Sequence, residues 1–180
     1  AEQVPAMDVY VLPNNKNIVM AAEQAARLAR TSGVRRIHVV PTTTIPQGIS
    51  AMMAYDESAE IKDNVEAMQE AASRVQSGSV TFAARDSDYD GHQIKEGELL
   101  ALENGKVAFT GTDLGSVTAK VAKDLMQEGS QFITLLYGEG VTEEQAADVE
   151  EAVRSLLPEE VELTVAYGGQ PVYYFLISVE

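Results

Sequence analysis

Short apolar runs alternate with stretches of helical spacing along the chain, and their order predicts an α/β fold. Apolar runs bounded by proline, glycine or asparagine are typical of buried strands. Apolar residues that recur every three or four positions are typical of a helix with one apolar face. We therefore expect strands at 9–12, 37–40, 132–137, 161–167 and 172–179, and helices at 18–29, 46–55, 61–75, 117–125 and 142–157.

The first and last parts of the chain follow the same plan of strand, turn, helix and strand. Residues 9–40 and residues 132–167 match in order and in length. Strands joined through a helix at this spacing favour parallel pairing. We therefore expect two related α/β lobes with mostly parallel sheets, and we place the first lobe at residues 1–96 and the second at residues 129–180.

The middle of the chain predicts an inserted β-hairpin. Apolar residues before and after Asn104-Gly105 suit two strands joined by a tight turn, because both turn residues tolerate a positive φ. With the helix that follows, this hairpin forms a predicted connection at residues 97–128. The preceding segment reads as a strand at 80–84, after a helix stop at Gly78, and then as a loop over 86–97.

Composition narrows the function more than it identifies one. The net charge is −15 with a pI near 4.4, which disfavours binding to nucleic acid or to anionic lipid. The chain has no cysteine, so disulfides and thiolate chemistry are excluded. No apolar run approaches the roughly 20 residues of a membrane span, and the start carries no basic segment followed by an apolar one. We expect a cytoplasmic protein, and the missing initiator Met suggests the C-terminal part of a longer chain.

Motifs for metal, nucleotide or catalytic chemistry are weak, and we predict no catalytic or metal-binding residue. Residues 86–91 match the first half of a calcium loop, but position twelve is Gly97 where a bidentate Glu is needed. Residues 111–116 lack the Lys of a P-loop, and no Gly-x-Ser-x-Gly elbow is present. His38 lies inside an apolar strand, where a satisfied core or sheet histidine is the ordinary explanation.

Two polar segments offer binding surfaces. Thr42, Thr43 and Thr44 place three hydroxyls before a predicted helix start, where an anion can bind free N–H groups, although ordinary helix capping is the simpler interpretation. The helix at 142–157 is rich in Asp and Glu. It is either a solvated face or a docking surface for a basic partner.

Five short motifs occur in an order that resembles one bacterial family. They are residues 12–17 (LPNNKN), 44–49 (TIPQGI), 64–68 (NVEAM), 94–97 (IKEG) and 167–173 (YGGQPVY). Together they resemble the C-terminal region of the dihydroxyacetone-kinase-like proteins that form the kinase component of bacterial fatty-acid kinase. The resemblance implies a DegV-like fold for both lobes. It also implies a parent kinase whose N-terminal domain holds ATP and magnesium, with no cofactor in this fragment.

The same resemblance implies a function in docking rather than in catalysis. In this family a separate DegV-type protein presents a fatty acid to the kinase, and the product is an acyl phosphate. Because sites in α/β proteins gather at strand ends, the expected contacts lie in three loops: Asn14, Asn15, Lys16 and Asn17; Thr42, Thr43 and Thr44; and Gly168, Gly169 and Gln170. The alternatives are a module that itself binds a fatty acid or another anion, and a free-standing hydrolase or phosphatase.

Overall fold

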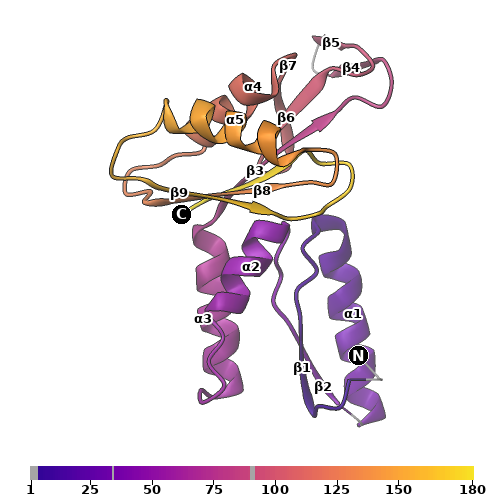
Figure 1. Ribbon diagram of the computed structural model, residues 1–180. Helices are drawn as coiled ribbons and strands as arrows, with labels where there is room; N and C mark the ends of the chain where they lie inside the picture. Colours follow the sequence, from indigo (N-terminus) through magenta and orange to yellow (C-terminus); the bar gives the residue numbers. More distant parts are fainter. Residues whose placement is uncertain (1–3, 34, 90–91) are drawn as a thin grey trace. The chain divides into compact units, whose positions relative to one another are not determined.

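The computed structural model describes residues 4–33, 35–89 and 92–180, and it consists of two compact units (Figure 1). The first unit ends at Val75 and the second begins at Gln76. Each unit has its own sheet and its own buried cluster of apolar side chains. The chain therefore folds around two separate cores.

The first unit is built on a parallel pair of strands joined by a helix. Strand β1 (Asp8–Val11) leads into α1 (Lys16–Ser32) and then β2 (Arg36–Val39), with Val9 opposite Ile37. The helices α2 (Ile45–Met53) and α3 (Ile61–Arg74) follow and pack against each other. The core is small: Val40, Ala51, Met68 and Ala72, with Tyr10 and Leu12 against them.

The second unit is a six-stranded mixed sheet covered on one face by two helices (Figure 1). In spatial order its strands are β7 (Lys106–Gly111), β6 (Leu99–Glu103), β3 (Gln76–Phe82), β10 (Phe175–Val179), β8 (Phe132–Tyr137) and β9 (Glu162–Tyr167). The covering helices are α4 (Leu114–Asp124) and α5 (Glu143–Arg154). All five residues of β10 are buried, which places this strand at the centre of the unit.

The α/β class is confirmed, but the expectation of mostly parallel sheets is wrong for the second unit. The predicted β-α-β units do pair in parallel, as β1 with β2 and β8 with β9. Strand β10, however, is antiparallel to both β3 and β8. The reason is the short connection at residues 168–174, which reverses the chain, whereas a parallel crossover needs a dozen residues or more.

The division into units also differs from the predicted lobes at 1–96 and 129–180. Residues 76–96 group with the second unit because β3 pairs with β10 near the end of the chain. The hairpin at 97–128 is not a connection between lobes, since β6 extends the same sheet on the other side of β3. Its turn is as predicted, with positive φ at Asn104 and Gly105.

Some local boundaries also move. Gly78 lies inside β3 and does not end a helix, because a Cβ there would meet Val121 and Leu125 of the covering helix segment. The predicted loop at 86–97 contains a short antiparallel pair, β4 (Ser87–Tyr89) with β5 (His92–Ile94). Asp90 and Gly91 of the calcium-like motif lie outside the described residues. Within the described ranges, no helix is both long and apolar enough to cross a membrane.

Candidate functional site

The loops that follow β1 and β2 meet at one end of the parallel pair. The backbone N–H of Asn14 donates to Thr42 Oγ1 at 3.2 Å, and the Thr42 hydroxyl donates to Asn14 Oδ1 at 2.7 Å. Thr42 is only 1% exposed, so this reciprocal pair satisfies buried polar groups. The sequence-based prediction that these two loops belong to one site is thus matched by direct contact.

Asn14 is held between this hydroxyl and the start of α2. Its φ is 53°, a left-handed conformation that asparagine tolerates better than most residues. A Cβ on Gly48 would come within 2.1 Å of Asn14 Oδ1. The glycine of the Thr-Ile-Pro-Gln-Gly motif therefore allows the Asn14 side chain to lie against the first turn of α2.

The remaining polar residues of these loops act mainly as helix caps. Asn15 caps α1 by accepting from the Asn17 N–H at 2.8 Å, and Thr44 caps α2 by accepting from the Gln47 N–H at 3.3 Å. Thr43 donates through both its N–H and its hydroxyl to Gln47 Oε1. Capping, the simpler of the two interpretations of the threonine turn, is therefore what the structure shows.

We expect replacement of Thr42 by valine to lower the free energy of opening of the β1–β2 pair by about 1–3 kcal/mol. The change leaves both the N–H and the Oδ1 of Asn14 without their buried partner. Native-state hydrogen exchange of the β1 and β2 amides measures this. Thr43→Val is the matched control because Thr43 is exposed; equal effects of the two changes would contradict a special role for the Asn14–Thr42 pair.

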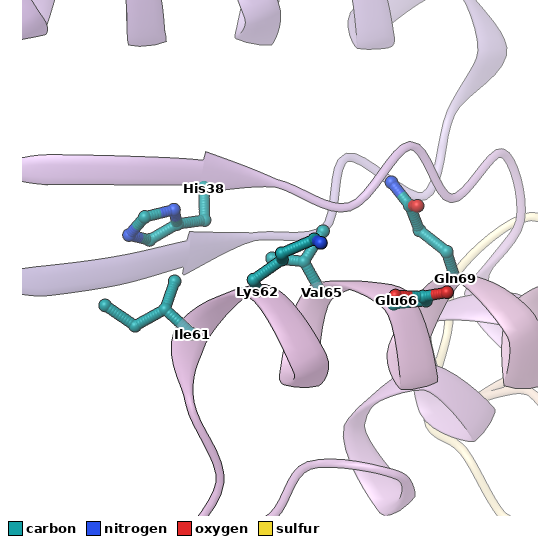
Figure 2. A pocket seen from close by; sticks show the side chains of 6 residues that line it. All are labelled: His38, Ile61, Lys62, Val65, Glu66 and Gln69. Carbon is teal, nitrogen blue, oxygen red and sulfur yellow. The ribbon is translucent and has the colours of Figure 1, made fainter.

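A groove runs along α3 and includes the threonine loop. One hollow of about 360 Å³ is lined by Pro41 and Thr43 after β2, by Gln47 of α2, and by Gln69, Ala72 and Ser73 of α3. A second hollow, of about 620 Å³, lies between His38 of β2 and the α3 side chains drawn in Figure 2. Gln69 lines both, so the two hollows adjoin.

His38 at this groove is a satisfied sheet histidine, as its setting in the sequence indicated. Its Nε2 lies 2.9 Å from Asp8 Oδ1, and its ring lies 5.4 Å from the ring of Tyr10. Hydrogen bonds from Arg36 and then His38 hold the pKa of Asp8 well below its ordinary value. Asp8 therefore stays ionised as a partner for both side chains, which fixes the imidazole in place.

An exposed apolar surface on α2 lies directly beyond the threonine loop. Ile45, Ile49 and Met52 follow one face of the helix at spacings of four and three residues, and Met53 continues it. Met52 is 65% exposed, while the opposite side carries buried Pro46, Ser50 and Ala51. We call these four residues, Ile45, Ile49, Met52 and Met53, the α2 apolar face.

The third predicted loop belongs to the second unit and forms a tight turn there. Gln170 donates from Nε2 to the Leu136 carbonyl at 2.8 Å, and Gly168 donates from its N–H to the Tyr137 carbonyl at 2.9 Å. Gly169 has a φ of 66°. These bonds join the ends of the parallel strands β8 and β9, which is the same position that the Asn14 and Thr42 loops take on β1 and β2.

The acidic helix α5 has the form of a solvated amphipathic helix. Thr142 and Gln145 complete a capping box at its start. Ala146, Val149 and Val153 are buried, while the acidic residues are exposed: Glu143, Glu144, Asp148, Glu150 and Glu151. The interpretation of this helix as a solvated face accounts for every one of these positions.

Sequence reasoning did not single out the α2 apolar face or the Asp8–His38 pair. The apolar spacing of α2 was visible, but spacing alone does not tell a buried face from an exposed one. A weak signal was polar Ser50 on what proves to be the inner side. Among the described residues, no group of three or more His, Asp or Glu side chains is placed to hold a metal ion.

The fold and these loops are those of a DegV-like α/β protein. A DegV family protein from Ruminococcus gnavus, solved with vaccenic acid, matches with a TM-score of 0.64 at 13% identity, over 99% of this chain and 74% of that one. The dihydroxyacetone kinase of C. freundii, solved with AMP-PNP and Mg²⁺, matches with a TM-score of 0.69 at 15% identity, over 94% of this chain and 38% of that one. At these identities the likeness concerns the fold alone.

Sequence comparison gives the family. The model of the FakA-like C-terminal family, which describes the C-terminal region of proteins like the kinase component of fatty acid kinase, matches residues 1–180, and the chain belongs to this family. A protein of Staphylococcus haemolyticus is 40% identical over 99% of this chain. The aligned region is 32% of that relative's length, so the chain spans about a third of the curated relatives it matches.

Proposed function

We propose that this chain binds a DegV-type fatty-acid-binding protein and serves as a non-catalytic docking domain of a fatty-acid kinase. The observation that carries the proposal is the α2 apolar face beside the loop of Thr42, Thr43 and Thr44. Four large apolar side chains lie exposed there, next to a loop whose own polar groups are already bonded. Such a surface suits a protein partner better than a small polar ligand.

The side chains of this surface are of a suitable kind for docking. Methionine is flexible and polarizable, so Met52 and Met53 can adapt to the contour of a partner. The buried Asn14–Thr42 pair and the Thr44 cap hold the start of α2 in a fixed position. A rigid helix with an adaptable apolar face loses little conformational entropy when a partner binds.

In the proposed assembly this chain supplies position and the chemistry takes place elsewhere. Other domains of the longer protein hold ATP and magnesium. A fatty-acid carboxylate oxygen, presented by the docked partner, forms the new bond to the γ-phosphorus, and ADP leaves. Docking raises the effective concentration of the carboxylate at the phosphate and fixes its orientation. The domain family and the DegV-like fold support this division of labour.

Deletion of residues 1–180 from the longer protein tests the proposal. We expect acyl-phosphate formation from ATP, fatty acid and the DegV-type protein to be lost, because the carboxylate is no longer held at the phosphate. Binding of ATP by the remaining domains should be retained, and calorimetry measures it. Undiminished turnover after the deletion would reject the docking role.

The second candidate function is direct binding of a fatty acid or a related anion. Vaccenic acid in the Ruminococcus gnavus protein of the same fold, and the hollow lined by Thr43 and Gln47, favour it. Native mass spectrometry of the protein purified from a lipid-rich host separates the two. A co-purified acyl ligand favours binding by the chain itself, and a ligand-free chain that still binds the DegV-type protein favours docking.

A further inference from the structure

The first unit contains a surface that matches the edge of an incomplete sheet. Among the described residues, β1 and β2 form a sheet of two strands only. Parallel sheets occur almost entirely where helices bury both faces and several strands pair, and isolated pairs are marginal. The strand β1 has the apolar sequence of a buried strand, but all four of its residues are half-exposed.

The two long sides of α1 differ in a way that identifies which edge is incomplete. Glu23, Arg27 and Arg30 line a hollow with Ile37 and Val39 of β2, so the β2 side of the helix is charged. At 100° per residue the opposite side carries Ile18, Ala21, Ala25 and Leu28. We call these four residues the α1 stripe; all are exposed, Ile18 by 50% and Leu28 by 71%.

The backbone of β1 has hydrogen-bonding groups directed to the same side. The carbonyls of Met7 and Val11 accept from β2, at Arg36 and Val40. Because successive residues of a strand direct their N–H and C=O groups to alternate sides, those of Tyr10 point to the other edge. No described strand pairs with that edge, which leaves it available for one more strand.

We infer that the free edge of β1 and the α1 stripe together bind the segment that directly precedes residue 1 in the longer protein, with one extended strand added beside β1 and apolar side chains laid over the stripe. The family is a C-terminal one, and the aligned region is 32% of a relative's length, so a long preceding segment is at hand. A charged side over β2 and an apolar side over β1 are what such a one-sided extension requires.

Thiol labelling of the purified full-length protein tests the inference without any partner present. This chain has no cysteine, so a cysteine placed in it can be followed by peptide mass spectrometry. We expect Ala25→Cys in the α1 stripe to react with a maleimide at least about tenfold more slowly than Arg27→Cys on the charged side, each rate being normalised to that of the denatured chain. Equal normalised rates would overturn the inference.

Two further measurements identify what covers the stripe and do not depend on a cysteine variant. The Tyr10 amide should exchange as slowly as that of Val9 in the full-length protein, and fast exchange would contradict an added strand. Photo-leucine at Leu28 should cross-link within one chain to a peptide that precedes residue 1. Cross-links between ¹⁵N-labelled and unlabelled chains would assign the surface to a second copy and overturn the proposed occupant. Both readouts are independent of whether the α2 apolar face binds a DegV-type protein.

Discussion

Substitution of Met52 by glutamate in the full-length protein is expected to weaken binding of the DegV-type fatty-acid-binding protein by at least about tenfold. Met52 lies at the middle of the α2 apolar face and is 65% exposed, so its replacement changes the surface and not the core. A carboxylate buried at an apolar contact has no partner for its charge, and the loss of about 1.4 kcal/mol corresponds to a tenfold change in Kd. Calorimetric titration of the two proteins measures it.

Met20→Glu provides the matched control for this prediction. Met20 is an exposed methionine of similar accessibility, 71%, but it lies on α1 outside both named surfaces. The same change of charge there should leave the Kd within about twofold of the original protein. If both variants bind as tightly as the original, the α2 apolar face is not the docking surface, even if the deletion of the whole chain abolishes turnover.

Replacement of Gly138 by alanine is expected to lower the free energy of opening of the second unit by about 3 kcal/mol. A Cβ at Gly138 would lie 2.2 Å from the carbonyl oxygen of Tyr173 and 2.5 Å from that of Gln170. Both contacts are backbone atoms, so no side chain can rotate away. The Gly138 N–H also donates to the Tyr174 carbonyl, and this bond would be lost if the turn moved.

Native-state hydrogen exchange of the β8 and β10 amides measures this effect in the intact protein. Gly140→Ala, two residues further on, is the matched control. Its Cβ would lie 3.6 Å from the Tyr174 ring, which is an ordinary contact, so a change below about 1 kcal/mol is expected. Similar exchange rates in the two variants would show that the turn around Gly138 adapts to a methyl group.

The candidate site was only partly predictable from the sequence. The rule that binding loops lie at strand ends brought Asn14 and Thr42 together correctly, because parallel strands end at the same edge. It did not reveal that Asn15 and Thr44 are occupied as caps, since capping and anion binding use the same residue types. The exposed α2 apolar face was not predicted, because a helical period gives the presence of an apolar face but not its surroundings.

Local interactions in the sequence determined most of the elements and their ends. The capping box at Thr142, the asparagine cap of α1, the Asn-Gly turn and the two β-α-β units all depend on residues close together in the chain. The tertiary structure alone decided that β10 lies antiparallel between β3 and β8, that Gly78 lies inside a strand, and that the boundary of the units falls after Val75. These depend on contacts between residues roughly a hundred positions apart, such as Val80 with Phe175, and no local pattern encodes which distant strand becomes the neighbour.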